Sequence, residues 1–193
     1  MVLISKVLPA VFMTMMAASG TSFEPGGLEY QKETFNLVVD NGNGEAELSA
    51  TYSDFGSKEE KSIDRKRDMD YLKNAVVTRV FLKEAADHGV EILDRRLDFE
   101  NFTLGIFVKA KAKQISRLFE VFALYQIEFD DMLYIIPLSG TVTQATLSPG
   151  GKIVVRNEQY AFAWPLDTQI ISFTAVYKRT GVSFRSELSK QGN

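Results

Sequence analysis

The sequence predicts an α+β domain with an N-terminal β-hairpin, one long α-helix, and then a twisted antiparallel β-meander curving over the helix. Three observations carry this prediction. Two alternating apolar stretches flank the turn sequence Asn41-Gly42-Asn43-Gly44, a helical pattern spans residues 68–88, and short alternating stretches separated by turn residues follow Gly89. A chain of 193 residues, 45% of them apolar, is long enough for one domain with a buried core.

The hairpin prediction includes a register. Apolar residues occupy every second position on both sides of the turn, and a loop of two residues or of four gives the same pairing. A slip by one residue would turn the two apolar faces to opposite sides of the sheet. The predicted register pairs Val39 with Ala46, Leu37 with Leu48, and Phe35 with Ala50.

The long helix is expected over residues 68–88. Ser57-Lys58-Glu59-Glu60 has the spacing of a capping box, so the helix could begin as early as Lys58, and Gly89 suits the position just after a helix end. Val77 and Phe81 form an apolar spot on the far side of the main apolar arc, which predicts a helix covered on two sides, as by a curved sheet. The main arc comprises Tyr71, Leu72, Ala75, Val76, Leu82, Ala85 and Ala86.

After Gly89 the pattern becomes one of period two. Lys109, Lys111 and Lys113 occupy one face of a strand whose other face is apolar, and they mark the solvent side. Residues 115–122 fit both a helical and a strand spacing; aromatic and β-branched residues favour strand for 115–129. The predicted strands are 90–98, 103–113, 115–129, 132–137, 141–147, 153–164, 169–177 and 182–185.

The N-terminus predicts export. Residues 1–20 resemble a secretory signal peptide: Lys6 precedes an apolar run over residues 7–18, and small residues follow it, so cleavage after Ser19 or Gly20 is expected. An uncleaved N-terminal anchor is the alternative, and it would be the protein's membrane contact. The chain has no cysteine, which suits a bacterial periplasm or cell surface. The expected division is a signal peptide (1–20), a linker (21–32), one α+β domain (33–186) and a polar tail (187–193).

Few chemistries are favoured by the residue types present. The net charge of −3 gives no field that would attract nucleic acid, and cysteine nucleophiles are excluded. His88, the single histidine, lies at the expected helix end, and no Gly-x-Ser-x-Gly elbow accompanies it. Residues 40–45 carry oxygen ligands but match a hairpin turn better than a calcium loop, so neither a metal nor another cofactor is predicted. Five carboxylates near predicted turns leave a carboxylate-based hydrolase as the third functional hypothesis: Asp94, Asp98, Glu100, Asp130 and Asp131.

Aromatic residues are the remaining signal, with 14 Phe and 7 Tyr beside one Trp. They either form a core packed on the helix or line a cavity between helix and sheet for an apolar guest, with tyrosine hydroxyls orienting it. The first functional hypothesis is therefore non-catalytic binding of a lipid-like or other apolar ligand in the cell envelope. The alternative is a protein-interaction or structural module of an envelope assembly, docking a partner protein through an edge strand or an exposed aromatic patch. The candidate ligand-binding residues are Phe119, Phe122, Tyr125, Tyr134, Tyr160, Phe162, Trp164 and Tyr177.

Overall fold

The computed structural model describes residues 27–40, 42–77, 79–100, 103–122, 125–137, 140–156 and 158–189. Within these ranges the side chains of residues 75–77, 79–81, 84, 100, 122 and 186 are not described. The predicted signal peptide lies outside the described residues. The elements are β1 (Leu28–Val39), β2 (Ala46–Ser57), α2 (Ser62–Val77), α3 (Arg79–Asp87), β3 (Val90–Glu100), β4 (Thr103–Ala112), α4 (Ile115–Phe122), β5 (Tyr125–Phe129), β6 (Leu133–Pro137), β7 (Val142–Leu147), β8 (Lys152–Arg156), β9 (Gln159–Trp164), β10 (Ile170–Tyr177), β11 (Val182–Ser183) and α5 (Arg185–Ser189).

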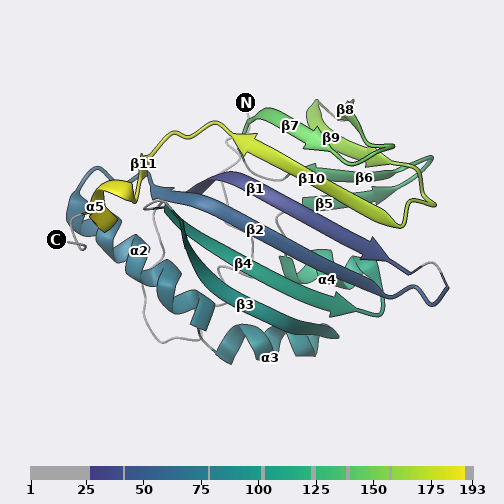
Figure 1. Cartoon of the computed structure of the whole chain (residues 1–193), viewed down its shortest axis with the longest axis horizontal. Coiled ribbons are helices and arrows are strands. Elements are labelled where there is room, and N and C mark those ends of the chain that lie inside the picture. Colours follow the sequence, from purple (N-terminus) through teal and green to yellow (C-terminus); the bar gives the residue numbers. More distant parts are fainter. Residues whose placement is uncertain are drawn as a thin grey trace.

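The strands form two antiparallel sheets. The larger sheet has the order β3-β4-β2-β1-β10-β7, with β11 paired to β2, and the smaller sheet has the order β5-β6-β9-β8. In Figure 1 the larger sheet crosses the front of the molecule, the smaller sheet lies at the upper right, and α2 and α3 run along the β3 side. The predicted α+β class, with its leading hairpin, long helical segment and antiparallel strands, is confirmed.

The predicted hairpin register is confirmed at all three pairs: Val39 with Ala46, Leu37 with Leu48, and Phe35 with Ala50. The turn is built from its own polar groups. The Asp40 carboxylate accepts the N–H of Gly42 at 2.8 Å, and Gly44 adopts a φ of +75° that glycine tolerates without a Cβ penalty.

The helical segment consists of two helices, α2 and α3, on either side of residue 78, which lies outside the described residues. It begins at Ser62 and not at Lys58, because β2 continues through Ser57, whose hydroxyl accepts the N–H of Glu59 at 3.1 Å. Gly89 has a φ of +73° and donates its N–H to the Ala86 carbonyl at 2.9 Å, as expected of the residue that ends a helix.

The single apolar arc predicted for this segment is confirmed only in part. Leu72 and Ala85 are buried as expected, whereas Leu82 and Ala86 are exposed. Figure 1 shows α2 and α3 pointing in different directions, so one angular projection cannot describe both helices. The second apolar spot predicted at Val77 and Phe81 falls on side chains outside the described set.

Residues 115–122 form the helix α4, so the expectation of strand for this stretch is wrong; the strand β5 begins at Tyr125. Leu118, Phe119 and Val121 lie on the buried face of α4. Arg117 and Glu120 lie on its exposed face and form an ion pair at 2.7 Å. The aromatic content that favoured strand reflects burial, because a short helix pressed on a sheet needs large apolar side chains as much as a strand does.

Three further boundaries differ from the prediction. The strand expected over 153–164 is the hairpin β8–β9, with Glu158 at a φ of +65° in its turn. The expected linker 21–32 overlaps β1, which starts at Leu28, and the expected tail overlaps α5, whose Glu187 binds Arg65 of α2 at 2.8 Å. Residues at both ends of the domain are thus tied into the fold by pairing and packing.

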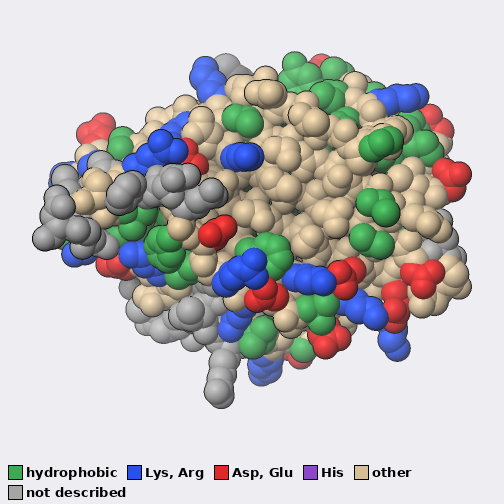
Figure 2. Space-filling view, viewed as in Figure 1, with side chains coloured by type: hydrophobic (Ala, Val, Ile, Leu, Met, Phe, Trp, Pro, Cys, Tyr) green, Lys and Arg blue, Asp and Glu red, His purple; other side chains and the backbone are tan. Residues whose placement is uncertain are grey.

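One core fills the space between the inner face of the larger sheet and a second layer formed by the helices and the smaller sheet. The apolar face of β4 is buried there, and its lysine face is the solvent side: Lys109 binds Glu47 at 2.8 Å and Lys111 binds Glu45 at 2.7 Å across the strands. Figure 2, which views this outer face, shows charged side chains of both signs side by side along its lower part. Within the described residues, none of the helices has the length and apolar character needed to cross a membrane.

Candidate functional site

A buried carboxyl lies on the inner face of the larger sheet. Glu33 of β1 is flanked in register by Tyr52 of β2 and Ala175 of β10, and none of its surface is exposed. Its Oε2 accepts a hydrogen bond from the Tyr177 hydroxyl at 2.8 Å. Its Oε1 has no hydrogen-bond partner among the described residues, and neither has the buried hydroxyl of Tyr52. We call Glu33, Tyr30, Tyr52 and Tyr177 the Glu33 cluster.

Aromatic rings surround this carboxyl. The Tyr30 ring lies 5.1 Å from that of Tyr52, 5.4 Å from that of Tyr177 and 5.9 Å from that of Phe55, each with an edge toward a face. Edge-to-face geometry is the favoured arrangement of such rings. Within the described part of the chain, Glu33 forms no ion pair. The carboxyl therefore lies in an apolar environment that contains phenol groups.

This apolar environment determines the protonation states of Glu33, Tyr52 and Tyr177. Burial raises the pKa of Glu33 to about 8, although the hydrogen bond from Tyr177 acts in the opposite direction. The carboxyl is accordingly neutral at pH 7 and has one proton to donate. Burial, and after it the neighbouring Glu33, hold the pKa values of Tyr52 and Tyr177 well above their usual range, so both phenols stay neutral as well. The cluster offers hydrogen-bond donors and acceptors without a net charge.

A larger aromatic core lies beside the cluster. Phe35 stacks on Phe173 at 4.8 Å, and the rings of Tyr125 and Phe162 lie 5.9 and 4.6 Å from Phe173. Trp164 follows at 6.3 Å and donates its indole N–H to the Ser148 hydroxyl at 3.1 Å. The buried Tyr125 hydroxyl has no partner among the residues that the structure describes.

The structure brings together only part of the predicted ligand-binding set. Phe119, Tyr125, Phe162 and Trp164 meet in the aromatic core, and Tyr177 belongs to the Glu33 cluster. Phe122 carries a side chain outside the described set.

Two of the predicted residues lie elsewhere. Tyr134 packs in a separate cluster of the smaller sheet, where its hydroxyl donates to Asp131 at 2.6 Å and the Arg156 guanidinium lies 4.1 Å from its ring centre. Tyr160 is 53% exposed, so it does not share the buried environment of Phe162 and Trp164.

Sequence reasoning missed Glu33 although a signal was available. In the predicted hairpin the inner positions of the first strand are 35, 37 and 39, so position 33 is the next inner position toward the N-terminus. The same register places Tyr52 opposite Glu33. An acidic residue at a core position of an otherwise apolar strand face is an unusual feature that can be found without a structure.

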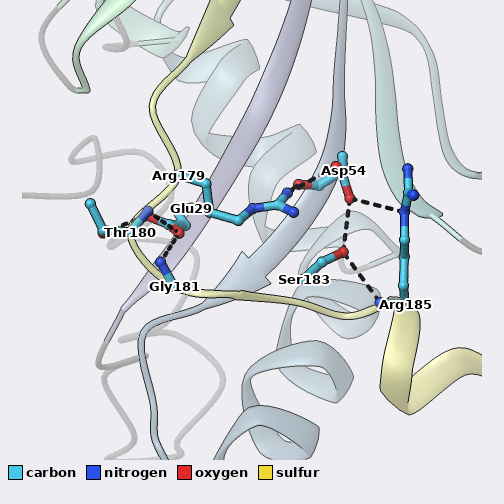
Figure 3. Close-up of polar contacts among 7 residues, drawn as sticks. All are labelled: Glu29, Asp54, Arg179, Thr180, Gly181, Ser183 and Arg185. Atoms are coloured by element: carbon cyan, nitrogen blue, oxygen red, sulfur yellow. Dashed lines mark hydrogen bonds and ion pairs between the residues drawn. The ribbon is translucent and has the colours of Figure 1, made fainter.

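A second set of polar residues lies at the end of the larger sheet, next to the Glu33 cluster (Figure 3). Asp54, at a φ of +57°, accepts the Ser183 hydroxyl at 2.9 Å and binds Arg179 at 3.1 Å. Glu29 accepts the backbone N–H of Thr180 at 3.0 Å and that of Gly181. These contacts, which we call the C-terminal clasp, hold residues 179–183 against β1 and β2 directly after Tyr177.

The clasp depends on close backbone contact. A Cβ added to Gly181 would lie 2.4 Å from the carbonyl oxygen of Ser57, so Gly181→Ala is expected to lower the free energy of unfolding by about 1–3 kcal/mol. Gly42→Ala is the matched control, because its Cβ would meet only a side-chain oxygen, at 3.2 Å. Urea denaturation of the two variants measures the difference. Equal stability of both would contradict the tight contact.

Neither a metal site nor a Ser-His-Asp triad is assembled among the described residues. In the described ranges no three His, Asp or Glu side chains lie together as a metal site. Ser57 donates to Asp68 at 2.5 Å inside the protein, and burial raises the pKa of Asp68, but the imidazole of His88 lies at the end of α3, with its Nδ1 3.8 Å from Glu120. The Ser57–Asp68 pair fastens β2 to α2.

The carboxylates considered for hydrolysis are spread over both sheets. Asp94 and Asp98 lie on β3 of the larger sheet, and Asp94 binds Arg96. Asp130 binds Arg156 at 3.0 Å beside the smaller sheet, next to Asp131. The side chain of Glu100 is outside the described set. Among the described side chains, the carboxylates of the larger sheet and those beside the smaller sheet are not seen to face each other as a catalytic pair would.

Comparison with known proteins gives no match to a family model, to a curated protein sequence or to a solved structure.

Proposed function

We propose that this protein binds an apolar, lipid-like ligand that carries one polar group, and that it does so in the cell envelope without catalysing a reaction. The observation that carries the proposal is that three of the four buried side-chain oxygens with no described partner lie in the Glu33 cluster and the aromatic core: Glu33 Oε1, the Tyr52 hydroxyl and the Tyr125 hydroxyl, the fourth being Asp68 Oδ1. Buried polar atoms are almost always hydrogen-bonded, so a partner other than the described residues is expected. A polar group of a ligand would supply it.

The chemistry of the Glu33 cluster suits an uncharged polar group. The neutral carboxyl of Glu33 can donate one hydrogen bond, and the Tyr52 hydroxyl can donate or accept. The apolar part of the ligand would lie against the aromatic side chains of the core, in the manner of most small-molecule sites. Orientation would come from the cluster and affinity from the rings.

The envelope location rests on the sequence pattern of residues 1–20 and on the absence of cysteine from the chain. An exported protein meets membrane-derived apolar compounds in that compartment. If the N-terminal segment stays uncleaved, it would also hold the protein at the membrane.

The ligand proposal is tested by native mass spectrometry of the protein purified from its host's envelope, followed by organic extraction and lipid analysis. We expect one small apolar molecule per chain. A protein that is bare, and that stays bare when a total lipid extract of the host is offered, would contradict the proposal. Ordered water would then be the partner of the three oxygens.

A second candidate function is that of an interaction module in an envelope assembly. Three large apolar side chains, Ile153, Val155 and Tyr160, are each at least half exposed on the hairpin β8–β9. Exposed apolar clusters of this kind mark protein contacts. A substitution on β8 that abolishes a protein contact and leaves ligand retention unchanged would separate the two functions.

A further inference from the structure

We propose that the protein self-associates through β8, which pairs antiparallel with β8 of a second copy and joins the two smaller sheets into one. The proposal specifies the partner in the interaction function above, and it does not depend on the ligand. It rests on four features of the β8 edge, namely its exposed apolar face, its uncharged centre, its self-complementary register and its charge.

The first feature is the apolar face of the hairpin. Ile153 is 50% exposed, Val155 69% and Tyr160 53%. The register pairs Val155 directly with Tyr160, so their side chains lie on one face, and Ile153 lies on the same face two residues along β8. β8 ends the order of the smaller sheet, and Figure 1 places it at the upper right rim.

The second feature is that the charged residues of β8 stand only at its two ends, and that no further strand pairs with it among the described residues. Natural edge strands are blunted by bulges, charges or covering elements. On the larger sheet, β3 has a register shift between Ile92 and Asp94 and is packed by α3. At the other end of the smaller sheet, Gln126 and Glu128 interrupt the apolar residues of β5. The centre of β8 has three consecutive β-branched apolar residues, 153–155, in a regular register.

The third feature is a register that complements itself. An antiparallel pair centred on Val154 sets Ile153 of each copy opposite Val155 of the other, so each exposed apolar side chain gains an apolar neighbour. The pairing joins odd positions with odd and even with even. Backbone groups that point away from β9 in one copy therefore meet equivalent groups in the second copy, as a two-fold contact requires.

The fourth feature is charge. The same register brings Lys152 of one copy toward Arg156 of the other, which would be repulsive if both charges stood at the edge. Arg156 instead folds back over the sheet: its guanidinium lies 4.1 Å from the ring centre of Tyr134, and it binds Glu128 at 2.5 Å and Asp130 at 3.0 Å. The two carboxylates and the one guanidinium of this group have a net charge of −1 in each copy. Lys152 of the other copy has no ion pair among the described residues, and its positive charge complements that group.

A contact of one five-residue strand and its side chains is smaller than the roughly 1,600 Å² of a standard stable interface. We therefore expect a dimer that dissociates on dilution. Sedimentation velocity of the full chain from about 10 μM to about 500 μM should show the mass rising from one copy toward two, a range typical of weak association. A monomer throughout this range would overturn the proposal.

Val155→Lys is the decisive variant, because a buried lysine opposite an apolar residue would weaken the dimer at least about tenfold. Gln144→Lys, on the exposed edge strand β7 of the larger sheet, is the matched control and should leave self-association unchanged. A dimer that Val155→Lys leaves intact would overturn the proposal. Circular dichroism of both variants establishes that each is folded.

A measurement on the unmodified protein serves if Val155→Lys does not fold. Hydrogen exchange of those amides in 153–155 that point away from β9 should slow as concentration rises, while exchange in β7 stays constant. Unchanged exchange in β8 would overturn the proposal. A photo-crosslinker at Val155 in host cells then identifies the partner: an adduct between two copies supports it, whereas an adduct with a different envelope protein overturns self-association and retains the interaction function.

Discussion

Replacing Glu33 with glutamine is expected to flatten the pH dependence of the protein's stability. The native carboxyl has a pKa of about 8 against an ordinary value of 4.5, so between these pH values the native state holds a proton that the unfolded state has lost. The free energy of unfolding therefore falls as pH rises through this window, by about 5 kcal/mol in total, and the contribution is constant below and above it. Glutamine does not titrate, so Glu33→Gln lacks this decline.

Urea denaturation at several pH values between 5 and 8 measures the effect. Comparing the two proteins cancels the titration of all other groups, and Glu33→Gln should gain stability relative to the wild type as pH rises. Glu47→Gln, which removes an exposed carboxylate paired with Lys109, is the matched control and should keep the wild-type slope. Parallel pH profiles for Glu33→Gln and the wild type would contradict a buried neutral carboxyl.

Phe173→Ala is expected to cost about 3–5 kcal/mol of unfolding free energy, the range for removing a buried aromatic side chain. The Phe173 ring joins the two sheets: it stacks on Phe35 of the larger sheet at 4.8 Å and lies 4.6 Å from Phe162 of the smaller one. Its loss would leave a cavity between these layers.

Tyr160→Ala is the control for this prediction, since a residue 53% exposed should cost less than about 1 kcal/mol. Both values come from chemical denaturation at a single pH. Similar losses for the two variants would mean that the sheets are not held together at Phe173.

The sequence was most informative where one local rule decided the structure. The hairpin register followed from an alternating pattern and a strong turn, because any slip would expose the apolar face. That register already places Glu33 and Tyr52 opposite each other inside the sheet. The central pair of the site was therefore within reach of sequence reasoning.

Other parts were decided by tertiary packing. Residues 115–122 became helical because their apolar side chains meet the sheet, and aromatic content does not distinguish a short buried helix from a strand. The turn between β8 and β9 contains neither Gly nor Pro, the residues by which a turn is usually recognised in a sequence. The C-terminal clasp joins Asp54 to Arg179 and Glu29 to Thr180, residues more than a hundred positions apart, and no local pattern predicts such contacts.

Native mass spectrometry of the wild type and of Glu33→Leu, both purified from the same host envelope, tests the central claim most directly. The claim predicts one apolar molecule per wild-type chain, and its loss or marked depletion in Glu33→Leu, which removes the hydrogen-bonding atoms of the side chain, while Glu47→Gln retains it. Circular dichroism at the same pH must show all three proteins folded. A wild type without ligand, or a variant that carries the same ligand at the same occupancy, would contradict a polar anchor at Glu33.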